Sequence, residues 1–393
     1  MPGMPHAGGR RTPGGTGRYP IAAIRQRIRE HDGPVLDFAV GRYREDPPDA
    51  VLELIRREAE PGLLTPCGQD DLDAFADAVV AMLDRIYGLR MASGSILPVP
   101  GGRTALSLLA SALIRPSDEI AVVEPAYPAF VRIVSQIGAR VRSVPLDPGR
   151  GFVPDERPLE PDTVGELGFV ALNFPNNPTG AAPPAEVLAG FLKRFGPGTI
   201  VFNDATYGPL TYDRPPWSIL TEAASLAGEL RLVELHSMAK LFATGPLPVS
   251  FLVGDEGLIE ALREFSEFAW SPQSALHVKV ARICLEDPDR LEEARAFYRN
   301  RMAKLRATLL ELGFEPYPAP AGMYILCPVP TSVGQRPVVD AGEAAEVLLT
   351  ELGVAVVPWE VAPHSYLRFS ARYLDEELEA LRGLARGARL VGG

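Results

Sequence analysis

The stretch Leu230-Arg-Leu-Val-Glu-Leu-His-Ser-Met-Ala-Lys240 joins a short apolar run to a lysine. The run from Leu230 to Leu235 has the length and composition of a buried strand. Removing the charged amine of a lysine from water at the end of an apolar sheet costs free energy. A functional lysine can justify that cost, because a desolvated amine can attack a carbonyl group. Lys240 is therefore either a surface residue just past a strand or a reactive amine. The other segments of the sequence distinguish between these two interpretations.

Further apolar runs of strand length flank this one and alternate with segments of helical spacing. The predicted strands are 95–99, 119–123, 168–173, 199–204 and 247–254. This alternation predicts an α/β fold with a mostly parallel sheet and helices on both faces, and Pro248 predicts that the last strand lies at an edge.

Ligands of open α/β sheets bind beyond the carboxyl ends of the strands. Residues with suggestive chemistry directly follow several of the predicted strands: Gly101, Tyr127, Asn177, Asp204 and Lys240. We therefore expect these residues to share one ligand site.

Composition excludes several classes of function. The net charge of -11 argues against a nucleic-acid partner, which would favour a basic face. The sequence has no apolar run near the roughly 20 residues that cross a bilayer, so no membrane partner is expected. Cys67, Cys284 and Cys327 are far apart and odd in number, which indicates a reducing cytoplasm. None has metal-ligand spacing with a histidine, so no metal site is expected.

Three motifs carry the chemistry of the predicted site. They are Asn173-Phe-Pro-Asn-Asn-Pro-Thr-Gly180, Phe202-Asn-Asp-Ala-Thr-Tyr207 and Ser237-Met-Ala-Lys240. Their order and spacing resemble those of the class I/II aminotransferase family, which are fold-type I enzymes dependent on pyridoxal 5'-phosphate (PLP). The resemblance covers residues 18–387 and implies a seven-stranded type of sheet in a large domain, followed by a smaller α+β C-terminal domain.

The resemblance assigns a role to each residue around the cofactor ring. Lys240 would form a Schiff base with PLP and shuttle a proton, and Asp204 would pair with the pyridine nitrogen. Tyr207 and Asn177 would bind the phenolic oxygen, and Tyr127 would lie on the ring face. The residues alone also allow Asp204 as a helix or turn cap, Asn177 as an Asx turn and Tyr127 as a core residue.

The same resemblance places a phosphate site at a helix start. Gly101, Gly102 and Arg103 would bind the phosphate with backbone N–H groups and the helix dipole, and Ser237 would add a hydroxyl.

The substrate is expected on the C-terminal side. Arg368 would bind the substrate α-carboxylate, although an interdomain ion pair would also explain this arginine. The backbone of Gly41 would line the same carboxylate site.

The chain departs from the family pattern at several positions. Pro248 stands where the family has a phosphate-binding arginine, and Ser250 stands where glycine is usual. Leu63 replaces a tyrosine that reaches the partner's phosphate, and Trp359 replaces a glycine near the mouth of the site. Arg103 is expected to restore the lost positive charge.

The resemblance predicts a cytoplasmic, homodimeric PLP-dependent aminotransferase that acts on an amino acid or an α-amino-acid-like substrate. The alternative is a non-transaminating PLP enzyme of specialised metabolism that catalyses β/γ-replacement, cyclisation or decarboxylation. A non-catalytic PLP-binding protein is disfavoured, because no DNA-binding segment precedes the fold and Lys240, Asp204 and Arg368 are present. The expected divisions are a disordered tail (1–17), an N-terminal arm with a small-domain segment (18–50), a large PLP-binding domain (51–285) and a small C-terminal domain (286–393).

Overall fold

A computed structural model of the chain describes residues 20–40, 49–58, 65–155, 167–242, 249–271, 273–361, 363–384 and 390–392. The predictions for residues 1–17, Gly41, Leu63 and Pro248 lie outside these ranges.

The centre of the fold is an eight-stranded sheet with the order β2-β9-β8-β7-β6-β3-β4-β5. Its strands are β2 (Ile96–Val99), β3 (Glu119–Glu124), β4 (Arg140–Asp147), β5 (Val153–Pro154), β6 (Phe169–Leu172), β7 (Ile200–Asp204), β8 (Arg231–Ser237) and β9 (Ser250–Gly254). Neighbouring strands from β4 through β3, β6 and β7 to β8 are parallel, whereas β9 runs antiparallel to β8 and β2. The predicted α/β fold with a mostly parallel sheet is therefore confirmed.

Three details of the sheet differ from the prediction. The sheet has eight strands instead of seven, and one of them is the two-residue β5, which pairs antiparallel with β4 at the edge. β9 is not an edge strand, because it lies between β2 and β8. The proline that suggested an edge precedes the ladder, which begins at Ser250, so it removes no hydrogen bond from the paired residues. β4 was not predicted, because its first half reads Arg-Val-Arg-Ser and its outward residues are polar.

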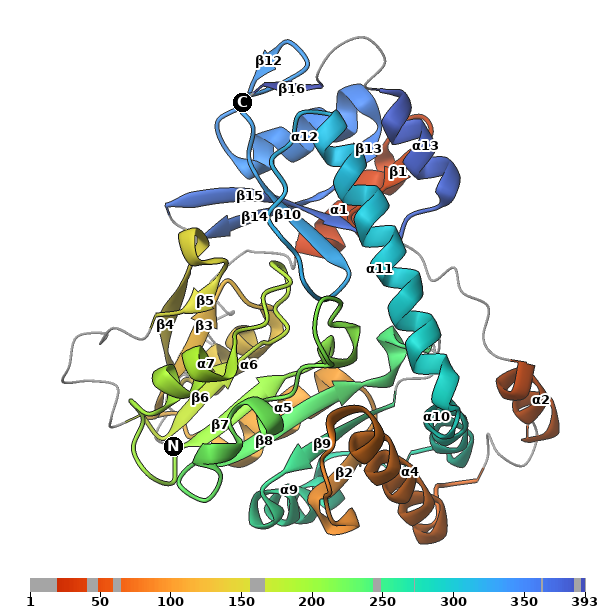
Figure 1. Cartoon of the computed structure of the whole chain (residues 1–393), viewed down its shortest axis with the longest axis vertical. Helices are drawn as coiled ribbons and strands as arrows, with labels where there is room; N and C mark the ends of the chain where they lie inside the picture. The colour runs from red at the N-terminus through yellow and green to blue at the C-terminus, as the bar shows by residue number, and fades with distance from the viewer. Residues whose placement is uncertain are drawn as a thin grey trace, which may run out of the picture.

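Helices cover both faces of this sheet (Figure 1). They are α4 (Gln69–Tyr87), α5 (Gly102–Leu113), α6 (Ala129–Ile137), α7 (Ala185–Leu192), α8 (Ile219–Glu222), α9 (Glu256–Ala269) and α10 (Ala275–Glu286). Alternation along β3 shows why both faces are apolar: Ile120 and Val122 pack with α5 and α6, whereas Ala121 and Val123 belong to the cluster that contains α7.

The long helix α11 (Pro288–Glu311) leads from the sheet to a smaller α+β part (Figure 1). Asp287 caps the start of α11 by accepting hydrogen bonds from two backbone N–H groups, and Pro288 occupies the first helical position. The smaller part contains a three-stranded sheet in the order β10-β15-β14. The elements of the whole smaller part, in chain order, are β10 (Tyr324–Pro328), β11 (Ser332–Val333), β12 (Arg336–Pro337), α12 (Ala341–Leu352), β13 (Val354–Ala355), β14 (Val357–Val361), β15 (His364–Ser370), α13 (Asp375–Gly383) and β16 (Val391–Gly392).

The N-terminal segment packs on this smaller part rather than on the large sheet. The segment comprises α1 (Pro20–Glu30) and β1 (Leu36–Asp37). Further along the chain, α2 (Asp49–Glu58) packs instead against α10, where Lys279 forms an ion pair with Glu58. β1 pairs in parallel with β13, and apolar residues of α1 pack in one cluster with residues of β13 and β14. Figure 1 shows α1 and β1 beside the C-terminal elements.

Candidate active site

The predicted site residues converge beyond the carboxyl ends of the parallel strands. Asp204 ends β7, and Lys240 follows β8 in the 3₁₀ turn η5 (Met238–Lys240). Tyr127 follows β3 and lines a small cavity together with Asn173 and Asp204. The structure therefore brings three strand ends to one place, as expected for a ligand site in an α/β sheet.

Asn173 connects these strand ends through its side chain. Its Oδ1 accepts hydrogen bonds from the backbone N–H groups of Tyr127 and Asn177, each at 3.2 Å. Its Nδ2 donates to the backbone carbonyl of Asp204 at 3.0 Å. Because Asn173 is buried, these three bonds fix the relative positions of β3, β6 and β7 at the site.

The Asp204 carboxylate lies on the floor of the site. Its Oδ1 accepts hydrogen bonds from the hydroxyl and the N–H of Thr206, at 2.6 and 3.2 Å. Burial raises the pKa of Asp204 above its ordinary value, whereas the bonds from Thr206 and the charges of His236 and Lys240 oppose that rise. A carboxylate in such a place favours a cationic partner.

The loop 173–180 connects the large sheet to the smaller part of the chain. Asn176 organises the loop by accepting hydrogen bonds from Thr179 and by donating to the carbonyl of Pro125 at 2.8 Å. Gly180 has a φ of 73°, and a Cβ at this position would lie 2.6 Å from the carbonyl oxygen of Ala321. The loop thus needs glycine both for its backbone conformation and for its contact with residue 321.

Arg368 on β15 enters the site from the smaller part. Its Nη1 donates to Oδ1 of Asn177 at 2.9 Å, and its guanidinium lies 4.0 Å from the ring centre of Tyr324 and 5.5 Å from that of Trp359. The side chain is buried, and its Nε has no hydrogen-bond partner within the described ranges. A buried arginine with an unused N–H group is suited to bind a carboxylate.

Two buried phenols pack together beside Arg368. The rings of Tyr207 and Tyr324 pack edge to face with centres 5.9 Å apart. Burial raises the pKa of Tyr207 well above its ordinary value. Burial also acts to raise the pKa of Tyr324, but the positive charges of Arg368 and Lys240 outweigh it and lower that pKa to about 8.

The start of α5 lies at the end of β2 and has features that suit an anion. Gly101 precedes the helix with a φ of 96°, and the first-turn N–H groups of an α-helix have no partner inside the helix. Ser237 ends β8, and Ser250 begins β9; both are buried. Arg103 lies on the first turn of α5 with an exposed side chain.

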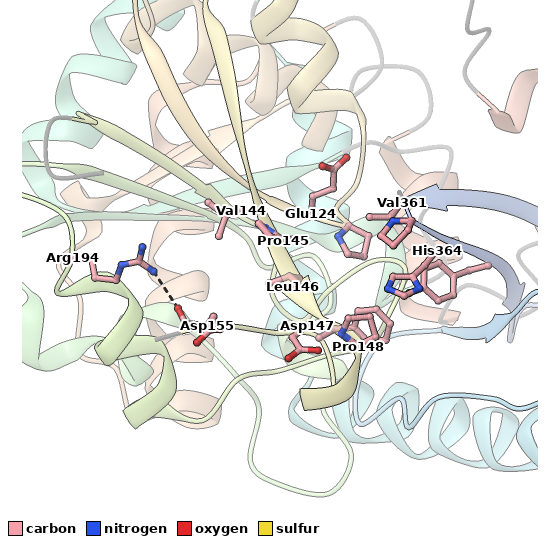
Figure 2. A pocket seen from close by; sticks show the side chains of 14 residues that line it. Glu124, Val144, Pro145, Leu146, Asp147, Pro148, Asp155, Arg194, Val361 and His364 are labelled. Carbon is pink, nitrogen blue, oxygen red and sulfur yellow. Dashed lines mark hydrogen bonds between the residues drawn. The ribbon is translucent and has the colours of Figure 1, made fainter. Parts of the chain in front are cut away.

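A larger cavity of about 460 Å³ lies elsewhere, between the β4–β5 edge of the sheet and the β14–β15 hairpin (Figure 2). Pro145, Pro148 and His364 are among its lining residues, and Arg194 donates to the backbone carbonyl of Asp155 at its side. The lining contains none of the residues predicted for the site among those that the structure describes. Chemistry rather than cavity size therefore identifies the candidate site.

Sequence reasoning did not single out three residues that the structure places in the site. Asn173 stood in a quoted motif without a role, and its contacts with two other strand ends become visible only in the fold. Tyr324 carried no motif at all. Ser250 appeared only as a departure from the family pattern.

Comparisons with known proteins match the chain to one family. The sequence model of the family described as "Aminotransferase class I and II" matches residues 33–382. An LL-diaminopimelate aminotransferase from Methanocaldococcus jannaschii is 28% identical over 353 residues, which cover 89% of this chain and 83% of that protein. The transaminase BacF from Bacillus subtilis is 27% identical over 292 residues, which cover 72% of this chain and 70% of that protein.

Solved structures show the same fold. A mutant of the aspartate aminotransferase from Thermus thermophilus has a TM-score of 0.81 and 24% identity, and the match covers 97% of this chain and 99% of that one. Among the described residues, no group of three His, Cys, Asp or Glu side chains could hold a metal ion. No helix in the described ranges is long and apolar enough to span a membrane. Because the family match spans most of its length, the chain belongs to the class I and II aminotransferases, a family of pyridoxal-phosphate-dependent transferases.

Proposed function

We propose that Arg368 binds the α-carboxylate of an amino acid whose amino group this enzyme transfers to an α-keto acid. The observation that supports this assignment is the environment of its guanidinium, which is buried, packed against Tyr324 and hydrogen-bonded to Asn177. Its Nε has no partner in the described part of the chain, so one N–H group remains for a ligand. A single arginine in this position orients the substrate Cα toward Lys240.

The residues present fit PLP. The buried hydroxyl of Ser250 has no partner in the described structure and lies at the start of α5, which suits a phosphate. The Asp204 carboxylate on the floor of the site suits a protonated pyridine nitrogen. When bound, PLP supplies an electron sink for the bond that breaks at the substrate Cα.

We assign the remaining roles to the residues of this chain. The Lys240 amine would hold the cofactor and would move the proton of the substrate Cα. Asp204 would pair with the pyridine nitrogen, Tyr127 would contact the ring, and Tyr207 and Asn177 would bind the phenolic oxygen. The first turn of α5, with Gly101 to Arg103, and Ser237 bind the phosphate.

The relatives suggest which substrates to test first. Several are named LL-diaminopimelate aminotransferase, and another is named transaminase BacF. Of these names, only the first gives a substrate. The proposal therefore fixes the α-amino acid core that Arg368 recognises, and LL-diaminopimelate is the first substrate to test.

We also propose a cytoplasmic homodimer. Three cysteines without disulfide bonds are consistent with a reducing compartment. The exposed Phe268 and Phe265 of α9 offer apolar area that a second copy could cover. The pairing of β1 with β13 supports the division into an N-terminal segment (18–50), a large domain (51–285) and a small domain (286–393).

The test is an amino-transfer assay of the PLP-loaded protein. Purified protein is incubated with individual amino acids and α-ketoglutarate, and the new amino acid is detected by mass spectrometry. In parallel, borohydride reduction and peptide mapping should place the phosphopyridoxyl group on Lys240, and Lys240→Ala should lose both the label and the activity. Release of CO₂ without new amino acid, or a label on Lys279, would contradict the proposal.

A further inference from the structure

The hydroxyl of Ser250 is a buried polar group without a partner. Ser250 is 0% exposed, and its Oγ has no hydrogen-bond partner among the described residues. Leaving a buried hydroxyl unpaired is unfavourable, and such groups are rare in native proteins. An unpaired buried hydroxyl of this kind therefore indicates that a ligand completes the site.

The position of Ser250 identifies the ligand group. Ser250 pairs with Ser237 of β8 on one side and with Val99 of β2 on the other. Paired residues of neighbouring strands point their side chains to the same face of the sheet, so the two serine hydroxyls share a face. A Cβ built on Gly102 would lie 3.9 Å from the Ser250 Oγ, which places this hydroxyl against the first turn of α5.

We propose that Ser250 is a cofactor-binding residue whose hydroxyl donates a hydrogen bond to the phosphate of PLP. Three features meet at this point: the unpaired N–H groups at the start of a twelve-residue helix, the Ser237 hydroxyl and the unpaired Ser250 hydroxyl. All of them donate hydrogen bonds, and a phosphate accepts several at once.

Gly102 and Ser250 act as a pair in this proposal. Because residue 102 has no side chain, the space in front of the Ser250 hydroxyl stays open. The Ser250 hydroxyl thus adds a neutral donor beside the start of α5. Arg103 differs from this pair because its side chain is exposed.

The test measures affinity rather than activity, with PLP and with pyridoxal, which lacks the phosphate. Apoprotein is titrated with each compound and followed by absorbance. Ser250→Ala should weaken PLP binding about tenfold, as expected for one hydrogen bond to a charged group, and leave pyridoxal binding unchanged. Phosphorus NMR of bound PLP should show a shifted resonance in the variant.

Two outcomes would overturn the proposal. Unchanged PLP affinity would show that the hydroxyl does not contact the phosphate, and an equal loss for PLP and pyridoxal would show a purely structural role. Gly102→Ala provides a second variant, because its Cβ would sit at ordinary contact distances from Ser250 and Leu235 and would cover the hydroxyl. This variant should also weaken the binding of PLP but not that of pyridoxal. Normal PLP binding would contradict the proposal that Gly102 keeps the Ser250 hydroxyl accessible.

Control variants separate this contact from general electrostatics. Ser107→Ala removes an exposed hydroxyl on the same helix and should leave both affinities unchanged. Arg103→Ala should weaken PLP binding at low ionic strength and lose that effect as salt screens an exposed charge. The Ser250→Ala effect should persist in high salt, and its disappearance there would contradict a direct buried contact.

Discussion

The guanidinium of Arg368 is held on three sides before any substrate arrives. Asn177 accepts a hydrogen bond from one of its N–H groups, and the guanidinium lies over the rings of Tyr324 and Trp359. These contacts restrict the side chain to one orientation, so little entropy is lost when a carboxylate binds. Trp359 therefore contributes to holding the arginine.

Replacing Arg368 should separate substrate binding from cofactor binding. Arg368→Ala removes a charge-assisted contact and should lower kcat/KM for α-amino acids about a hundredfold or more. Arg368→Lys keeps the charge but not the planar pair of donors, so it should recover only part of the loss. The visible absorbance of bound PLP should be unchanged in both variants. Normal turnover by Arg368→Ala, measured by steady-state kinetics and Cα–H exchange in deuterated solvent, would refute the assignment.

Tyr324 should titrate in an accessible pH range in the cofactor-free protein. Its pKa is lowered to about 8, so the phenol is neutral below that pH and ionised above it. Ultraviolet titration should show a tyrosinate step near pH 8 that Tyr324→Phe removes. Lys240→Ala should move the step upward, because one of the positive charges that lower this pKa is lost.

Tyr373 provides the matched control for this titration. Burial raises its pKa to about 12, so Tyr373→Phe should leave the step near pH 8 intact. If the wild-type protein shows no tyrosinate step below the ordinary tyrosine pKa, Tyr324 does not lie close to these positive charges, and the prediction is wrong.

At the scale of the element, the loop 173–180 fixes the position of Arg368 relative to the large sheet. Asn203 on β7 holds the backbone of Phe174 by hydrogen bonds to both its N–H and its carbonyl, at 2.8 and 2.7 Å. Asn203 in turn donates to the buried carboxylate of Glu234 on β8 at 3.0 Å. Two strands therefore fix the loop that presents Asn177.

Alanine substitutions at Gly180, which lies in this loop, and at Gly198, which lies outside it, measure how closely the loop packs against residue 321. Both have positive φ, 73° and 80°, so alanine at either position should cost about 1–2 kcal/mol of backbone strain. At Gly180 the new Cβ would also meet the Ala321 carbonyl, which should add about 1–3 kcal/mol. At Gly198 no atom lies within 4 Å of that Cβ.

Urea unfolding and kinetics should distinguish the two variants. Gly180→Ala should be the less stable and should lower kcat/KM, because the loop displaces Asn177 from Arg368. Gly198→Ala should lose only stability. Equal stability of the two variants would show that the contact between residues 180 and 321 relaxes freely.

The sequence predicted most of the large sheet and the strand-end residues, because apolar runs and turn residues are local signals. It missed β4, whose polar residues alternate with apolar ones, and it misplaced β9, because a proline near a strand does not show which residues pair. Contacts such as Asn177 with Arg368 join residues 191 positions apart. No local pattern reports them, and the family resemblance alone had placed these two residues in one site.

At the scale of the whole molecule, the two parts of the chain are connected at several points around the site. α11 runs between them, and the N-terminal β1 pairs with β13 of the smaller part (Figure 1). Phe38 next to β1 is buried, and its carbonyl accepts a hydrogen bond from Ser370 two residues beyond Arg368. The N-terminal segment therefore helps to position the strand that carries Arg368.

The surface of a single chain also predicts its assembly. Phe268 at the end of α9 is 90% exposed, which leaves a large aromatic side chain in water. If the proposed homodimer covers it, light scattering should give twice the 42.4 kDa chain mass, and Phe268→Glu should weaken the dimer by placing a charge in an apolar contact. Val339, which is 85% exposed on the smaller part, provides the control, and Val339→Glu should leave the mass unchanged. A dimer that is insensitive to Phe268→Glu would place the contact on another face, and a stable, active monomer would refute the homodimer itself.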